Sequence, residues 1–439
     1  MAMRWRSSSF CWPFAVLALS PLSTVARADN WPQWRGERND GVSHETGLPT
    51  TWSETENVAW RVALPGPAGS TPVVWDDRIF LTSAKGQELV LLCFDTDGQP
   101  LWERTVAMGD QPVRGDEGNY ASPSPSTDGK YVWTFMGTGD LACYDFNGNE
   151  IWKFNTQDRF GRFDISFGMS STPVLDGDRL YIQLLHTGAA VVAALDKNTG
   201  KTIWRHDRAS DATKECEHSY ASPMLYRDED HEFLLTHGAD YTVAHRLSDG
   251  AELWRCGGMN PKGRYNYTLR FVASPVAAEG LIVSPTAKNG PVIAISPDAK
   301  GNVSDGGSGQ VWSRRDNTPD VPSPLVHDGF VYLCRETGIV LCLDAKTGKE
   351  YYMERGYSMR HRASPVYADG KVYLTARDGR VTVLKAGPVY KVLATNTLGK
   401  EDSISSSPVI SNGRIYLRTF DALYAIEDKS RGVASLSRD

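Results

Sequence analysis

The sequence lacks long apolar runs and a surplus of basic charge. Its one extended hydrophobic stretch, residues 10–22 (FCWPFAVLALSPL), is too short to span a bilayer comfortably, so no transmembrane segment is predicted. The 439 residues carry 47 Lys and Arg against 53 Asp and Glu, a formal net charge of −6. Nucleic acids and anionic lipid surfaces are bound through dense Lys and Arg. The composition therefore argues against either as the main partner.

The signatures of several common chemistries are also missing. There is no H-E-x-x-H, no G-x-S-x-G and no glycine-rich phosphate loop. Nine His are scattered through the chain without metal-ligand spacing, and no C-x-x-C-H is present to attach a haem covalently. The sequence predicts neither a catalytic residue nor a metal ligand.

The first 28 residues have the features of a signal peptide. A basic start (MAMRWR) precedes the short apolar run, and Ala26-Arg27-Ala28 is a small-x-small cleavage site. We therefore expect cleavage near Ala28 and a mature protein in the periplasm or outside the cell. The segment contains three Arg and no acid, so its removal moves the net charge from −6 to −9.

A small residue followed by proline recurs along the whole mature chain. The prolines are separated by 51, 50, 50, 52, 49, 41 and 43 residues, and the markers are Thr71-Pro72, Ser122-Pro123, Thr172-Pro173, Ser222-Pro223, Ser274-Pro275, Ser323-Pro324, Ser364-Pro365 and Ser407-Pro408. Each unit contains four short segments rich in β-forming residues and bounded by Asp, Asn and Gly. Four-stranded units at this period indicate a propeller.

We predict an all-β, eight-bladed β-propeller of four-stranded antiparallel blades over residues 57–427. The eighth unit ends without a tryptophan-bearing strand, whereas residues 57–65 (NVAWRVALP) form such a strand without a unit of their own. The N-terminal strand is therefore expected to complete the last blade and remove an open edge. Residues 29–56 form an N-terminal extension, and residues 428–439 form a tail.

A second repeated phrase, at residues 194–204 (ALDKNTGKTIW), joins the third and fourth strands. Asp196 is expected to accept backbone hydrogen bonds in the turn with Thr199, Gly200 to take a positive φ, and Trp204 to pack between blades. Copies at 93–102, 143–152 and 342–352 place a Cys where Ala194 stands, which we interpret as packing. Whether Cys216 and Cys256 form a disulfide is left open.

The A-x-D-x-x-T-G-x-x-x-W phrase resembles the tryptophan-docking motif of the pyrroloquinoline quinone (PQQ) propeller superfamily. The match is full at Ala194, Asp196, Thr199, Gly200 and Trp204, and the copy at 342–352 has Cys and Tyr replacements. The whole of residues 30–427 is similar to exported bacterial PQQ-like repeat proteins. The resemblance implies the propeller fold, but the superfamily holds both enzymes and scaffolds.

Two functions follow from the resemblance. One is a PQQ- and Ca²⁺-dependent quinoprotein dehydrogenase that oxidises alcohols or sugars. The other is a non-catalytic scaffold, like the scaffold subunit of the outer-membrane assembly machinery. Alcohol-oxidising quinoproteins carry an adjacent Cys-Cys pair that is missing here, and no converging set of calcium ligands is evident. We therefore favour a scaffold without cofactor, and keep the dehydrogenase as the alternative.

The connections that enter the first strands are long and irregular in the early units, so their face is the predicted working face. Residues just before each marker should surround the channel mouth there: Tyr120, His218, Tyr220, Arg270, Asp320, His361 and Arg362. They would bind a small polar or anionic ligand or anchor a peptide, or else merely plug the channel. The expected partner of this monomer is an envelope protein, a peptide or an extracellular polymer.

Overall fold

The computed structural model describes residues 1, 30–115, 117–304, 306–399 and 402–429. The predicted cleavage site and nearly all of the signal segment and C-terminal tail lie outside the described residues. Within the part that is described, no helix is both long and apolar enough to cross a membrane.

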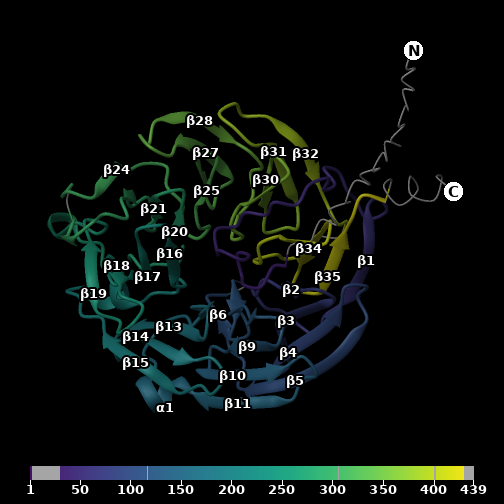
Figure 1. Cartoon of the computed structure of the whole chain (residues 1–439), viewed down its shortest axis with the longest axis horizontal. Coiled ribbons are helices and arrows are strands. Elements are labelled where there is room, and N and C mark those ends of the chain that lie inside the picture. The colour runs from purple at the N-terminus through teal and green to yellow at the C-terminus, as the bar shows by residue number, and fades with distance from the viewer. Residues whose placement is uncertain (2–29, 116, 305, 400–401, 430–439) are drawn as a thin grey trace.

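The described residues form eight antiparallel sheets arranged in a ring, as predicted (Figure 1). The first four blades are β2 (Val73–Trp75), β3 (Arg78–Lys85), β4 (Glu88–Asp95) and β5 (Pro100–Met108); β8 (Ser126–Thr127), β9 (Tyr131–Phe135), β10 (Asp140–Asp145) and β11 (Glu150–Asn155); β12 (Val174–Asp176), β13 (Arg179–His186), β14 (Ala189–Asp196) and β15 (Thr202–Asp207); and β16 (Met224–Arg227), β17 (Glu232–Gly238), β18 (Tyr241–His245) and β19 (Glu252–Cys256).

The remaining blades have the same order from the axis outward. They are β20 (Val276–Ala278), β21 (Leu281–Ser284), β22 (Val292–Ile295) and β24 (Gln310–Arg314); β25 (Leu325–His327), β26 (Phe330–Cys334), β27 (Ile339–Asp344) and β28 (Glu350–Arg355); β29 (Val366–Ala368), β30 (Lys371–Thr375), β31 (Val381–Lys385) and β32 (Val392–Asn396); and β33 (Val409–Ser411), β34 (Arg414–Arg418), β35 (Ala422–Ile426) and β1 (Val58–Ala63).

Short elements lie in the connections between blades. They are the hairpin of β6 (Pro112–Val113) and β7 (Gly118–Asn119), the helix α1 (Thr156–Phe160), the 3-10 turns at Lys214–Glu217 and Lys262–Arg264, and β23 (Gly301–Asn302).

The N-terminal strand closes the ring. In the eighth blade β1 pairs antiparallel with β35, and Val58 lies opposite Ile426, Trp60 opposite Ala425 and Val62 opposite Leu423. The first and last colours of the chain therefore meet in one sheet in Figure 1. This confirms the prediction drawn from the missing fourth strand of the last repeat.

The repeated turn of one blade receives the tryptophan of the blade before it. In the third blade, the Asp196 carboxylate accepts hydrogen bonds from the backbone N–H and the hydroxyl of Thr199, each at 2.8 Å. Gly200 has φ +66°, and a Cβ there would lie 2.8 Å from the Trp152 ring. Glycine is thus required both by the backbone conformation and by the close approach of the indole.

The same docking is repeated at the next interface around the ring. The buried Trp204 indole N–H donates to the backbone oxygen of Leu247 at 2.8 Å, and its ring covers Gly250. Burial of an indole removes roughly 150–250 Å² from water. Each interface of this kind therefore joins neighbouring blades through both apolar burial and a directed hydrogen bond.

A ring of hydroxyl groups connects the first strands around the axis. Across the described residues, each member's backbone N–H donates to the side-chain oxygen of the next member at 2.9–3.1 Å, and the circle closes from Ser407 to Thr71. The members are Thr71, Ser124, Thr172, Ser222, Ser274, Ser323, Ser364 and Ser407. The second member is Ser124, so the marker placed at Ser122-Pro123 is corrected by two residues.

The N-terminal extension closes one end of the axial channel. The backbone of Trp31 pairs with Val74 of the first blade, and the side chain of Gln33 bonds Leu175 of the third. Further along, Ser43 donates to Tyr367 of the seventh blade. These partners follow the hydroxyl ring in their strands, so the extension crosses the end opposite the blade-entry connections. Trp34 lines the channel from this side.

The segment between β22 and β24 of the fifth blade contributes a strand to its neighbour: β23 within it pairs parallel to β19 and covers the outer edge of the fourth blade. The pairing is possible because Gly301 takes φ +64° there. Cys216 and Cys256 are both buried and free, so no disulfide joins them.

Candidate functional site

The axial channel is a funnel whose throat has two layers. The inner layer is the hydroxyl ring, and the outer layer consists of the residue two positions before each ring member. Because side chains alternate along a strand, residues two apart face the same side. The outer layer is Gly69, Ser122, Ser170, Tyr220, Val272, Val321, Arg362 and Ser405. The throat encloses about 170 Å³ and the adjoining mouth about 180 Å³.

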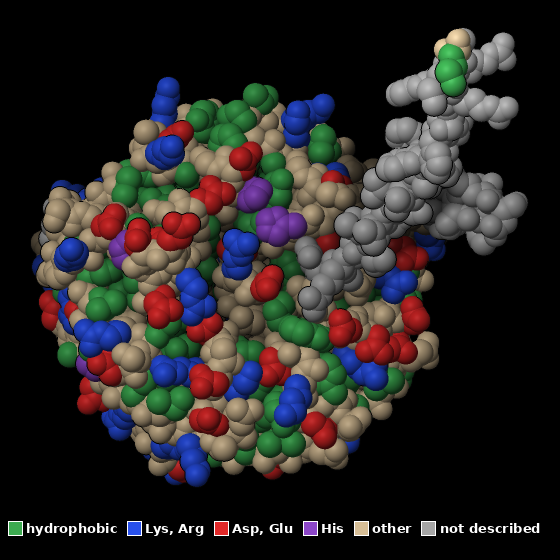
Figure 2. Space-filling model, in the orientation of Figure 1, with side chains coloured by type: hydrophobic (Ala, Val, Ile, Leu, Met, Phe, Trp, Pro, Cys, Tyr) green, Lys and Arg blue, Asp and Glu red, His purple; other side chains and the backbone are tan. Residues whose placement is uncertain are grey.

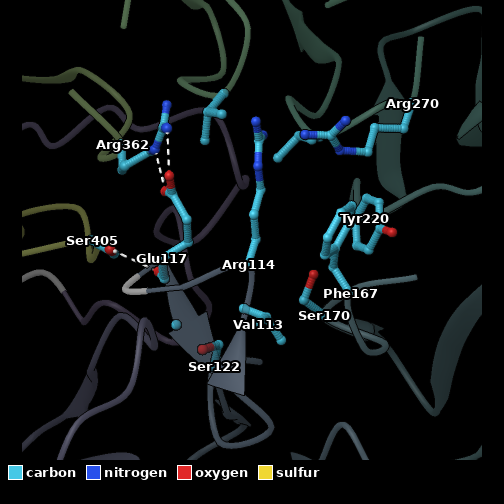
Figure 3. Close-up of a pocket in the computed structure, with 13 residues that line it drawn as sticks. Val113, Arg114, Glu117, Ser122, Phe167, Ser170, Tyr220, Arg270, Arg362 and Ser405 are labelled. Carbon is cyan, nitrogen blue, oxygen red and sulfur yellow. Dashed lines mark hydrogen bonds and ion pairs between the residues drawn. The ribbon is translucent and has the colours of Figure 1, made fainter. Parts of the chain in front are cut away.

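The mouth is formed by connections that enter the first strands, on the face predicted from loop length. Arg114 and Glu117 come from the β6–β7 hairpin, Phe167 from the connection into the third blade, and Arg270 from the connection into the fifth. Figure 3 shows the Arg114 side chain standing between the Arg362–Glu117 pair and the side that carries Arg270. Three guanidinium groups therefore converge on one opening.

Glu117 is the single carboxylate among the described residues that line the mouth, and it forms ion pairs with arginine side chains. Its two oxygens accept from Arg362, with one Arg362 nitrogen 2.6 Å from Oε1, and Arg360 lies 3.2 Å from the same oxygen. Burial, the largest single effect, would raise the pKa of Glu117. The hydrogen bonds from Arg362 and the positive charges of Arg362, Arg360 and Arg377 together outweigh it and hold the pKa below its usual range. The carboxylate is ionised, and its negative charge is balanced by the ion pairs with Arg362 and Arg360.

Arg270 is buried beside an aromatic wall and keeps only a weak acidic partner. Its side chain is 7% exposed, its guanidinium lies 5.0 Å from the centre of the Phe167 ring, and its nearest carboxylate oxygen, on Glu215, is 3.5 Å away. The neighbouring Lys288 has a lowered pKa, first because of burial and then because of the positive charge of Arg270. The mouth is thus a region of concentrated positive charge in an acidic protein.

This propeller is similar to known proteins in both sequence and structure. The profile of the family described as outer membrane protein assembly factor BamB matches residues 42–118 and 90–353, which is more than half of the chain. The chain belongs to this family. Its β-propeller is built of the family's PQQ-like repeats.

Individual relatives are distant. BamB of Burkholderia pseudomallei is 28% identical over 133 residues, which span 30% of this chain and 31% of that protein, about a third of its length. BamB from Moraxella catarrhalis shares 13% identity over 84% of this chain and 99% of that one, with a TM-score of 0.61. A europium-containing methanol dehydrogenase shares 12% identity over 89% of each chain, with a TM-score of 0.68. At these identities, the likeness to the solved structures shows a shared fold and nothing about function.

Three of the seven residues predicted at the channel mouth line it in this BamB-family propeller: Tyr220, Arg270 and Arg362. The other four do not. Tyr120 packs against Gly137 and Gly168, and Asp320 stays outside the lining. His218 bonds to the hydroxyls of Ser166 and Thr187, and His361 to the backbone oxygen of Met359. The side chains of these four residues either occupy positions that do not face the axis or pack against the connections instead of the channel.

The most informative residues were missed by the sequence reasoning. Arg114, Glu117 and Phe167 lie far ahead of the markers, in connections whose folded course the repeat does not specify. One signal was available, because Gly115 follows Arg114 within a long irregular connection. The inward direction of these side chains depends on the β6–β7 hairpin, which carries no repeat signature.

The funnel does not fit a calcium-assisted quinone. Ca²⁺ takes six to eight oxygen ligands, several of them carboxylates. Among the described residues no group of three or more His, Cys, Asp or Glu is placed to hold a metal ion. Glu117, the one acid of the lining, is already paired with Arg362. The half-buried indole of Trp34 does offer a flat aromatic surface at the inner end.

Proposed function

We propose that this chain is an exported, non-catalytic propeller scaffold that binds a protein partner in the cell envelope through the funnel mouth. The observation that carries the proposal is a funnel closed at its inner end by the N-terminal extension and open at its outer end, where three arginines converge. Membership of the BamB family supports the envelope role, and the Burkholderia relative is named an outer membrane protein assembly factor.

The chemistry of the lining favours binding over catalysis. A general acid or base needs a titratable group within hydrogen-bond reach of substrate. The nearest imidazoles, His218 and His361, are buried and bonded away from the throat, and Glu117 is held by arginine. What remains in the throat is hydroxyl, aliphatic, aromatic and guanidinium surface, which orients a ligand without transforming it.

The signal-peptide pattern of residues 1–28 supports export, so the periplasm is the proposed compartment. Outside the funnel, the face in Figure 2 mixes acidic and basic side chains rather than gathering one sign. A broad charged surface of the kind that binds nucleic acid is not apparent on that face. This is consistent with recognition at one localised opening.

The proposal is tested by capturing partners from envelope extract with the wild-type protein and, in parallel, with a variant whose funnel is narrowed. Val272→Tyr places a second aromatic ring in a layer that already accommodates Tyr220, and so narrows the throat with little strain on the strand. Ile203→Ala, on the exposed outer strand, is the matched control. We expect a protein retained by the wild type and by Ile203→Ala but lost with Val272→Tyr. Equal retention by all three would refute a partner site in the funnel.

The quinoprotein alternative has one observation in its favour, the Trp34 surface in a propeller similar to methanol dehydrogenase. PQQ with Ca²⁺ added to the purified protein, followed by absorbance and dye-linked oxidation of alcohols and sugars, tests it. The scaffold proposal predicts no saturable turnover. Turnover that Val272→Tyr abolishes would replace the scaffold function with the dehydrogenase.

A further inference from the structure

The throat of the funnel is lined by hydroxyl groups whose protons have no protein acceptor among the described residues. Each hydroxyl oxygen of the ring accepts a backbone N–H, yet within the described part of the chain none of the eight hydroxyls donates its own proton to a protein acceptor. All eight line the throat. A buried donor without a partner is unfavourable, so an acceptor-rich group in the throat would be stabilised.

The guanidinium groups above the hydroxyl ring also have few acceptors among the described residues. Arg114 makes no hydrogen bond or ion pair with any described residue and stands within the opening (Figure 3). Arg362 holds Glu117 through Nε and Nη2, and its Nη1 is buried, so Arg362 adds positive charge to the opening rather than an accessible donor. Arg270 is buried, and among the described residues its guanidinium has one ion-pair contact, at 3.5 Å to Glu215, besides the Phe167 ring. Guanidinium forks suit planar oxyanions, above all carboxylates.

The closed inner end limits which anionic ligands can enter. The N-terminal extension bonds to the first, third and seventh blades across the axis, and Trp34 stands at the bottom of the throat. A polymer cannot thread through a channel that is closed at one end. An anionic group can reach the hydroxyl ring only if it terminates a chain or is a small free molecule. In a protein partner, the group with this chemistry at a chain end is the C-terminal carboxylate.

We propose that the funnel captures the free C-terminal carboxylate of an extended peptide segment of its partner. The carboxylate contacts Arg114 and Arg270 beside the Arg362–Glu117 pair, and its deeper oxygen faces the hydroxyl ring. Phe167, Tyr220, Val272 and Val321 contact the last side chains. The inference rests on the proposed scaffold function and specifies which part of a partner is recognised.

The test compares peptides that differ only at the C-terminus. The full-length mature protein is immobilised and incubated with a random hexapeptide library as free acids, and separately with the same library as C-terminal amides. Retained peptides are quantified by mass spectrometry. We expect the acids to be retained about tenfold more than the amides, the effect of one strong charge-assisted contact.

Three variants make the result specific to the funnel. Arg114→Gln removes an unpaired surface-reaching cation, and Val272→Tyr narrows the throat; each should remove most of the preference for acids. Arg205→Gln, on the outer strand β15, removes an equal charge far from the axis and should leave the preference intact. Circular dichroism and thermal unfolding establish that each variant is folded.

The outcomes separate this inference from the function on which it rests. Equal retention of acids and amides would overturn it, as would retention that follows internal Asp or Glu rather than the free end. So would a preference that survives Val272→Tyr. If the envelope partner is nevertheless lost with Val272→Tyr, the scaffold function stands and only the carboxylate inference falls.

Discussion

At the scale of single residues, the interfaces between blades depend on glycines placed under tryptophans. Gly200 is constrained twice, by φ +66° and by the Trp152 ring, while Gly177 has φ +55° with open space around it. Both glycines occupy backbone conformations that cost other residues roughly 1–2 kcal/mol. Comparing the stability cost of substituting each glycine therefore isolates the contribution of the close contact between Gly200 and the Trp152 ring.

We predict that Gly200→Ala destabilises the protein more than Gly177→Ala. Gly177→Ala should cost about 1 kcal/mol from backbone strain alone. Gly200→Ala should add about 1–3 kcal/mol, because the new methyl forces the indole out of its packed position. Urea unfolding followed by tryptophan fluorescence measures both. Equal costs would mean that the Trp152 contact contributes little to the joint between blades.

A buried imidazole gives the fourth blade a dependence on pH. His245 Nδ1 lies 2.9 Å from the backbone oxygen of Gly250 and so carries the proton, and Nε2 accepts from the Thr236 hydroxyl at 2.9 Å. That hydroxyl oxygen in turn accepts from Arg208 at 2.9 Å. Burial lowers the pKa of His245 to about 3, because the charged ring would lose solvent.

The consequence is a loss of stability in mild acid. Below the unfolded value near 6.5, the unfolded chain binds a proton on His245 that the folded chain does not bind, so stability falls as the pH drops from about 6.5 toward 3. The stability advantage of wild type over His245→Gln should shrink by about 1.4 kcal/mol per pH unit in that range. Urea unfolding between pH 7.5 and 4.5 measures it, with exposed His44→Gln as control. A constant difference would contradict the assignment.

At the scale of secondary-structure elements, strand β1 decides whether the ring is closed. It pairs with β35 along its length, and further bonds join Leu64 to Asp421 and Glu427 to Asn57 beyond the strand ends. Without β1, the edge of β35 would be open and able to pair with another chain. β1 therefore acts as the fourth strand of a blade, although it is distant from that blade in sequence.

Native-state hydrogen exchange tests this role without a mutation. We predict that peptides covering β1 are as protected as peptides covering β15, the equivalent outer strand of a blade made from one continuous segment. Structural units that open cooperatively exchange together. Rapid exchange in β1 alongside slow exchange in β15 would show that the N-terminal strand is only loosely attached.

The elements were predictable because each repeat restates the same local constraints. The Ser/Thr-Pro marker fixes the innermost strand, the Asp–Gly turn fixes the third-to-fourth connection, and Trp204 and its equivalents fix the outer strand. The exceptions arose where a local signal was ambiguous. The run Ser122-Pro123-Ser124-Pro125 offers two markers, and only the hydrogen bond from Thr71 to Ser124 distinguishes them. The short β23 has no periodic pattern of its own.

At the scale of the whole molecule, the funnel is a property of the ring and not of any repeat. Each of the two layers of its wall takes one residue from every blade, and its mouth takes Arg114, Phe167 and Arg270 from connections of unequal length. The sequence placed the candidate mouth on the face where long connections cluster, and three of its seven candidate residues, Tyr220, Arg270 and Arg362, line the mouth. It could not identify Arg114, whose position depends on a hairpin specified only by the folded surroundings.

The arrangement of the molecule allows a stable ring and the proposed binding site to coexist. The tryptophan joints and the outer strands lie at the rim, whereas the funnel residues lie in connections that the joints hold in place. Substitutions at the mouth should therefore alter binding with little change in stability, and substitutions at the joints should do the reverse. The two sets of residues can be tested independently.

Site-specific photocrosslinking in intact cells tests the central claim most directly. A photoreactive amino acid replaces Val321 in the throat in one strain and Ile203 on the outer rim in another. The account predicts a covalent adduct with an envelope protein from position 321, lost when Val272→Tyr is added, and none from position 203. Adducts from position 203 alone, or a throat position that never reacts with another protein, would contradict a partner-binding funnel.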